Sequence, residues 1–247
     1  MKKLFTLVLG LAFAVAASAQ YVCTKQGTVL NYTKTAEIDN KNVEYICKTT
    51  VTQVTDNPDG TVTVILTEEE TEAANRLNSH SSKEKAIYNP ADTTTTIMFG
   101  DPESVLDELI STISSQAASA GHMLGESDLQ KIRDAIKVKG ELPLKVNPNY
   151  PAGAKQPNQT MRIDLGQMGN ITMNLWEIKA GGRETIEVPA GTYDCLKYSV
   201  VLRTSAMGQT EKNYLTLWFA EGIGNVRTVL SDKKGKTLGE EVLTSIK

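Results

Sequence analysis

The chain has 247 residues, with 26 lysines and arginines against 29 aspartates and glutamates, and a formal net charge of −3. A mildly acidic chain without a basic block is a poor partner for the phosphate backbone of nucleic acids, so we expect no nucleic-acid partner. After the amino terminus no apolar run has the length of a transmembrane helix. Threonine, valine and isoleucine recur along the chain, which favours β-strands.

The first 19 residues predict a secretory signal peptide. Two lysines precede an apolar run at 4–15, and the small residues at 17–19 form a cleavage site of the A-x-A kind. Cleavage near Ala19 leaves a mature chain, 20–247, that we expect to form a single β-rich domain. Because no cysteine follows the cleavage site directly, we expect a periplasmic or secreted protein that has no lipid anchor and does not span the membrane.

The first half of the mature chain predicts antiparallel strands. Segments 27–38, 43–54 and 62–74 have strand composition, and residues 85–99 give two shorter strands. The third segment ends in an acidic run, Glu68 to Glu72. Calcium loops intersperse carboxylates with glycine and carbonyl ligands rather than stacking them, so we interpret this run as a solvated strand end.

Residues 101–137 predict a pair of helices inserted between strands. Asp101 is placed to cap a helix over 101–116 with Pro102 at its first position. Ser127 and Gln130 have capping-box spacing at the start of a second helix over 127–137. Each helix has only one apolar side, so we expect the pair to pack on one face of the sheet.

The second half of the chain predicts more antiparallel strands after a proline-rich connection. Strands in quick succession, joined by glycine-bearing turns such as 180–182, leave no room for parallel crossovers. In the stretch 188–191, Pro189 and Gly191 occupy the second and fourth positions of a type I turn. We interpret this stretch as a hairpin turn without chemistry of its own.

Several motifs resemble the TapB-like family of exported bacterial proteins, which carries a domain of unknown function. These motifs are GTVLNY at 27–32, VPAGTYDCLK at 188–197 and WFAEGIGNV at 218–226. The resemblance covers about 21–70 and 140–247. It implies a mainly β (α+β) fold, a long curved antiparallel sheet or unclosed β-barrel similar to lipoprotein carriers, with helices at its mouth. The motifs hold turns and core positions, so any function taken from them is analogy.

Residues that could carry chemistry are few. His80 and His122 lie in stretches of small residues, and we interpret both as exposed loop histidines. A zinc site needs three or four nitrogen or sulfur ligands close together, which two isolated histidines and three scattered cysteines do not supply. We therefore predict no catalytic residue, no metal and no cofactor. A carboxylate pair for hydrolysis stays open, since no spacing among the acids singles one out.

The three cysteines allow one disulfide. Export permits such a bond, and a hairpin between the first two strands places Cys23 opposite a residue beyond Cys47, which disfavours that pair. We therefore expect Cys195 to pair with Cys23 or with Cys47, with three reduced thiols as the alternative. In a separate motif, Asp92-Thr93-Thr94 resembles a bacterial O-glycosylation acceptor, against the simpler interpretation of a polar strand edge.

Aromatic residues on the later strands give the only hint of ligand binding. Tyr214 and Trp218 share one face of their strand, while Leu215, Leu217 and Phe219 share the other. Both faces are therefore apolar enough to be covered. If part of the sheet stays open, the candidate lining residues are Trp176, Tyr198, Tyr214, Trp218, Leu106, Ile110 and Ile113.

Three functions remain open on these observations. The favoured one is a non-catalytic envelope protein whose curved sheet binds a partner or an envelope component. The alternatives are a carrier of a lipid or other apolar small molecule, and a hydrolase with a carboxylate pair. A large apolar cavity under the helices would favour the carrier. A well-packed sheet face would favour the binding scaffold. Two carboxylates that face each other, one of them with a raised pKa, would favour the hydrolase.

Overall fold

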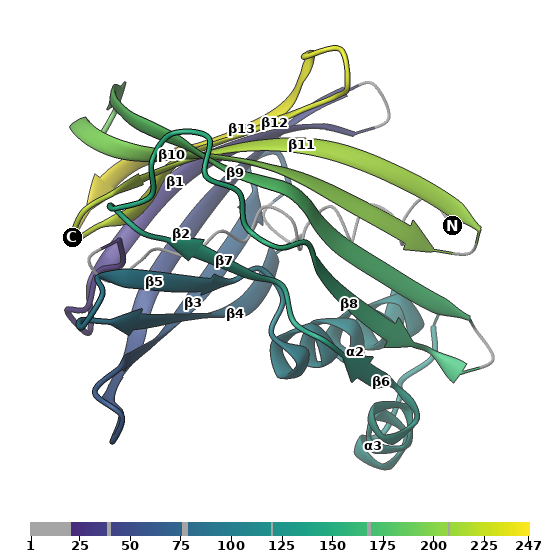
Figure 1. Cartoon of the computed structure of the whole chain (residues 1–247). Coiled ribbons are helices and arrows are strands. Elements are labelled where there is room, and N and C mark those ends of the chain that lie inside the picture. The colour runs from purple at the N-terminus through teal and green to yellow at the C-terminus, as the bar shows by residue number, and fades with distance from the viewer. Residues whose placement is uncertain (1–20, 39–40, 76–78, 120, 167–168, 207) are drawn as a thin grey trace.

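The computed structural model describes residues 21–38, 41–75, 79–119, 121–166, 169–206 and 208–247 (Figure 1). The predicted signal peptide and its cleavage site lie outside these residues. Within them, thirteen strands form one antiparallel sheet in the order β6-β8-β9-β10-β11-β12-β13-β1-β2-β3-β4-β5-β7. The predicted mainly β fold, an antiparallel sheet that is not closed into a barrel, is therefore confirmed.

In chain order the elements are β1 (Val29–Ile38), β2 (Lys41–Asp56), β3 (Val62–Glu72), β4 (Ser79–Asn89), β5 (Thr94–Met98), α2 (Pro102–Ser119), α3 (Glu126–Ala135), β6 (Lys137–Lys139), β7 (Pro143–Val146), β8 (Gln159–Asp164), β9 (Asn170–Val188), β10 (Gly191–Ala206), β11 (Gln209–Ala220), β12 (Gly224–Ser231) and β13 (Thr237–Ile246).

The sheet is bent, so that one of its faces turns inward. Figure 1 shows β9–β13 lying above β3–β5 and β7. Successive side chains of a strand point to opposite faces, and one face of this sheet carries the fully buried leucines Leu30, Leu66, Leu217 and Leu243. We call this the inner face. Leu215, Leu217 and Phe219 lie on it, and Tyr214 and Trp218 on the outer face, as the alternation in the sequence predicts.

A buried tyrosine connects the two layers of the bent sheet. Tyr198, on the inner face of β10, reaches Asn147, the residue that follows edge strand β7. Its hydroxyl oxygen accepts a hydrogen bond from the Asn147 backbone N–H at 3.0 Å, and both residues are buried. The Tyr198 ring also packs edge-on against Phe219, with 6.0 Å between the ring centroids. The bend is thus held by a polar contact inside an apolar core.

The two helices lie on the open side of the sheet, where α2 contacts β4 and β6. The predicted cap of α2 is confirmed, because Asp101 Oδ2 accepts a hydrogen bond from the Ser104 backbone N–H at 3.2 Å. The predicted start of α3 is wrong. Gly125 is its N-cap residue, no side chain caps it, and Ser127 already lies inside the helix.

The turn predicted at 180–182 is not present. Strand β9 continues through Gly181 and Gly182, and its register with β10 shifts between Lys197 and Tyr198. Gly182 has φ +87°, and a Cβ on Gly181 would lie 3.1 Å from Cγ of Lys197. These glycines therefore form a bulge rather than a turn. The hairpin at 188–191 is confirmed by the pairing of Val188 with Gly191.

We expect Tyr198→Phe to lower the free energy of unfolding by about 1–3 kcal/mol. The substitution keeps the ring but leaves the buried Asn147 N–H without its partner, which costs about that amount. Urea denaturation measures the change. Tyr214→Phe, on the outer face of the neighbouring strand, is the matched control and should change stability by no more than about 0.5 kcal/mol. Equal losses in the two variants would contradict the role of the hydroxyl group.

Candidate functional site

Six ionisable side chains lie together on the inner face, and we call them the acidic cluster. They come from five strands that are neighbours in the sheet, from β13 through β1, β2 and β3 to β4. The members are Lys34, Cys47, Glu68, Glu70, Glu84 and Glu241. His80 lies beside them on β4, opposite Glu70. Four carboxyl groups and one ammonium group give the cluster a net charge of −3 when all are ionised.

The strand register brings these residues together. Residues directly opposite each other in an antiparallel pair share a face and lie close to each other. Lys34 on β1 is opposite Glu241 on β13, and Cys47 on β2 is opposite Glu70 on β3. Glu68 lies two residues before Glu70, and therefore on the same face.

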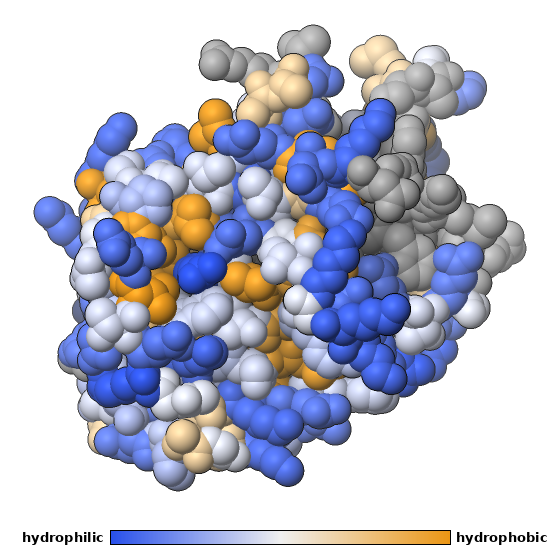
Figure 2. All heavy atoms as spheres, turned by 90° about the horizontal axis from the view of Figure 1, so that it is seen from above, coloured by the Kyte–Doolittle hydropathy of each residue, from blue (hydrophilic) through white to orange (hydrophobic). Residues whose placement is uncertain are grey.

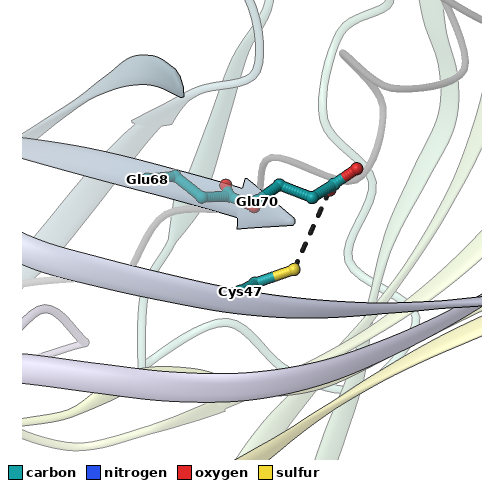
Figure 3. A group of neighbouring side chains, drawn as sticks. All are labelled: Cys47, Glu68 and Glu70. Carbon is teal, nitrogen blue, oxygen red and sulfur yellow. Dashed lines mark hydrogen bonds between the residues drawn. The ribbon is translucent and has the colours of Figure 1, made fainter. Parts of the chain in front are cut away.

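Direct contacts connect the members of the cluster. Lys34 forms an ion pair with the Glu70 carboxylate. Cys47 Sγ lies 3.8 Å from Oε2 of the same carboxylate, and Figure 3 shows this thiol on β2 facing Glu70 on β3. The Glu68 and Glu84 side chains are hydrogen-bonded to each other. Oε1 of Glu84 is buried and accepts no hydrogen bond from a donor among the residues that the structure describes.

Burial controls the protonation of the cluster. Glu84 and Glu241 are only 5% and 4% exposed. Loss of hydration, followed by repulsion from Glu68, raises the pKa of both carboxyl groups well above the usual value. For Lys34, burial alone would lower the pKa, but the surrounding carboxylates outweigh it and the pKa is raised. Burial therefore favours the neutral form of these two carboxyl groups, while the neighbouring carboxylates favour the ammonium form of Lys34.

The Cys47 side chain is a poor nucleophile in this environment. Burial first, and then the charge of Glu241 and Glu68, raises the pKa of its thiol far above the ordinary value. Only the thiolate attacks electrophiles efficiently, so a thiol held protonated is inert. The arrangement does not activate Cys47 for covalent chemistry.

The acidic run is not the solvated strand end that the sequence predicts. Glu68 is buried on the inner face, and Glu69 points outward, where Lys48 Nζ donates to its carboxylate at 2.9 Å. The loop assignment of His80 is also wrong, since it lies on β4 opposite Glu70. His122 is exposed outside the regular elements, as predicted. Successive side chains of a strand point to opposite faces. Applied to the acidic run, this rule would have placed Glu68 and Glu69 on opposite faces of the sheet.

The predicted ligand-lining residues are not brought together. Tyr198 lies on the inner face, whereas Trp176, Tyr214 and Trp218 lie on the outer face. Leu106, Ile110 and Ile113 of α2 are half-buried against the hydrophobic core. Figure 2 looks down on the upper layer. Among the described residues that it shows, apolar side chains form separate patches between polar ones.

Trp218 is occupied by protein contacts on the outer face. Its indole N–H donates to Glu184 Oε2 at 3.1 Å. The Lys197 ammonium and the Arg227 guanidinium each lie 5.2 Å from its ring centroid. These cation–π and hydrogen-bond contacts account for its burial, so Trp218 needs no ligand to explain it.

No disulfide forms among the three cysteines, all of which lie in the described residues and are free. The expected bond from Cys195 to Cys23 or Cys47 is therefore absent. For Cys47 the reason is geometric. Cys195 is on the outer face of β10 and Cys47 on the inner face of β2, so a bond between them would have to cross the sheet.

The motif at 92–94 forms a tight turn before β5. Thr93 has φ +56°, and Asp92 Oδ1 accepts a hydrogen bond from the Thr94 backbone N–H at 2.9 Å. Thr94 itself is buried, with its hydroxyl 2.6 Å from Nδ2 of Asn147. The motif therefore has a structural role at the end of β7.

The sequence matches a family model described as DUF3108-like over residues 25–243. This chain belongs to the DUF3108-like family. None of the curated proteins matches it. In the part of the DUF3108-like chain that the structure describes, no helix has the length and apolar character needed to cross a membrane.

Two solved structures share the fold of this DUF3108-like protein. One is a candidate exported protein with a YmcC-like fold from Bacteroides fragilis, with 18% identity, a TM-score of 0.61, and coverage of 92% of this chain and 98% of its own. The other is a candidate lipoprotein from Parabacteroides distasonis, with 15% identity, a TM-score of 0.64, and coverage of 94% and 99%. At these identities the likeness shows the fold alone.

We expect Glu84→Gln to stabilise the protein at pH 8 and to change it little at pH 5. Because the pKa of Glu84 is raised in the folded protein, the folded state binds a proton that the unfolded state has lost at pH values above its own pKa of about 4.3. The free energy of unfolding therefore falls as the pH rises, and glutamine removes this dependence. Each kcal/mol gained should raise Tm by about 2–4 °C. Thermal melts at the two pH values measure it, with Glu69→Gln as the exposed control, and an equal change at both values would contradict the assignment.

Proposed function

We propose that this protein is an exported, non-catalytic binding protein of the bacterial envelope, which holds a positively charged ligand on the inner face of its curved sheet. The observation that carries the proposal is the acidic cluster. Within the DUF3108-like family, the motifs at 188–197 and 218–226 support a place among the TapB-like proteins. The predicted leader at 1–19 supports export.

The cost of burying the cluster supports a binding role. Moving carboxyl groups out of water is unfavourable unless each finds a partner. The Lys34 ammonium group and the His80 imidazole are the basic groups that face four acids here. Glu84 Oε1 accepts no hydrogen bond within the described chain. Buried groups with strongly perturbed pKa values concentrate at functional sites. A bound cation would supply the missing positive charge, whereas a lipid tail would not.

The contacts within the cluster support binding rather than hydrolysis. Retaining and inverting glycosidases hold their two carboxyl groups about 5–5.5 Å or 6.5–9.5 Å apart, so that a sugar or a water fits between them. Glu68 and Glu84 are in direct hydrogen-bond contact, which leaves no such gap. Cys47, the nearest thiol, is held protonated. The cluster therefore offers charge and hydrogen bonds without an activated nucleophile.

Packing beneath the helices supports a charged ligand over a large apolar one. Gly100, next to the start of α2, lies so close to β8 that an added Cβ would be 2.6 Å from Cε of Met161. Leu142 and Val105 are also fully buried there. This part of the core is closely packed and leaves little room for a lipid chain.

We expect native mass spectrometry of protein purified from its own host to show a non-covalent adduct. The double variant Glu84→Gln/Glu241→Gln should lose the adduct, because it removes two of the buried carboxyl groups that bind it, and Glu69→Gln should keep it. Circular dichroism checks that the double variant is folded. The extracted adduct should be recovered unchanged after incubation with fresh protein.

Two results would contradict the proposal. An adduct retained by the folded double variant would place the ligand elsewhere. Chemical conversion of the adduct by the wild-type protein, lost in the same variant, would support the hydrolase instead.

A further inference from the structure

We propose that the acidic cluster is a binding site for a divalent cation of the zinc class, with Cys47, Glu68 and Glu70 as ligands and Glu84 as the fourth. The inference rests on the proposed binding function of the inner face and names the class of ligand. The donor atoms of Cys47, Glu68 and Glu70 all lie within 4.8 Å of one another. A tetrahedral zinc holds oxygen and sulfur donors at about 2.0–2.3 Å, so a modest contraction of these side chains completes the site.

The donor types select the metal. Calcium and magnesium take oxygen ligands almost exclusively, whereas a cysteine sulfur favours zinc and its transition-metal neighbours. Cys47 faces the Glu70 carboxylate across the β2–β3 pair (Figure 3). A sulfur with two or three carboxylates is a donor set suited to zinc and poorly suited to calcium.

Glu84 gives an independent indication of a ligand site. The residue is only 5% exposed, its carboxyl group contacts that of Glu68, and its Oε1 accepts no hydrogen bond from a donor among the described residues. Such an oxygen loses its hydration without compensation. A metal ion beside Glu68 would accept its lone pair and remove that cost.

The charge of the cluster fits one divalent cation. With the four carboxylates, the Cys47 thiolate and the Lys34 ammonium group all ionised, the cluster carries a charge of −4, and a divalent ion reduces this to −2. Zinc binds cysteine as the thiolate, so the Cys47 proton, together with protons that burial holds on the acids, is released to solvent as the ion enters. Lys34 is the internal competitor, because its ammonium group already binds the Glu70 carboxylate. A metal ion that takes Glu70 must displace Lys34, which can turn to Glu241, its neighbour across the β1–β13 pair.

Zinc titration of the purified protein, in competition with a chromophoric chelator, tests the proposal. We expect one zinc ion per chain. Glu84→Gln and Cys47→Ser should each weaken binding by about tenfold or more. The matched control Glu69→Gln, on the outward side of the same strand, should leave the affinity unchanged. Lys34→Met should tighten binding, because it removes the competing ammonium group.

Cobalt(II) substitution tests the sulfur ligand in the wild-type protein, so the answer does not depend on a variant that folds poorly. We expect a thiolate-to-cobalt charge-transfer band in the wild-type protein and in Cys23→Ser and Cys195→Ser, and its loss in Cys47→Ser. Absence of the band in the wild-type protein, or its persistence in Cys47→Ser, would overturn the site.

The result also separates this inference from the proposed function. If zinc does not bind while an organic cation is found as the native adduct and is lost in the Glu84→Gln/Glu241→Gln variant, the metal site is wrong and the binding function stands. If zinc binds with one ion per chain but is retained by Cys47→Ser and Glu84→Gln, the ion lies elsewhere and the inference fails.

Discussion

The pairing of the first strand with the last is the interaction on which the rest of the molecule depends. In the strand order, β13 and β1 are the neighbours at which the carboxyl-terminal half of the sheet meets the amino-terminal half. Backbone hydrogen bonds of 2.9 and 2.8 Å join Val29 to Lys247 at the end of this pair. Contacts so distant in sequence carry a high entropy cost of loop closure and form slowly. They nevertheless decide the position of the acidic cluster, since Lys34 and Glu241 meet only across this pair.

Much of the fold could be predicted from local patterns, but the site depends on register. Alternation separated the two faces of β11, and the Pro-Ala-Gly turn at 189–191 marked a hairpin, because both signals lie within a few residues. Glu68 is buried because β3 is paired with β2 on one side and with β4 on the other. The acidic run alone does not show that its strand lies inside the sheet. The bulge at Gly181 similarly reflects the Lys197 side chain of a neighbouring strand, and not the local tripeptide.

The acidic cluster lowers the stability of the fold, and the proposed binding function accounts for that cost. Replacing buried ion pairs by apolar side chains of similar size often stabilises a protein. A sequence selected for stability alone would therefore carry leucines at these positions, like the neighbouring Leu66 and Leu243. The chain instead carries an ammonium group and four acids at the centre of its sheet, where the strands are paired on both sides. The backbone hydrogen bonds of the paired strands hold these charged side chains in fixed positions. A selective ion site requires such pre-organisation of its ligands.

The two edges of the sheet are its shortest strands, and this has a consequence for association between molecules. β6 has three residues, and β7 has four and begins with Pro143, which has no N–H to donate. An edge this short offers few free backbone groups to a strand from another molecule. The sheet can thus stay open along one side without acting as a template for fibrils or for edge-to-edge pairing with other copies of the chain.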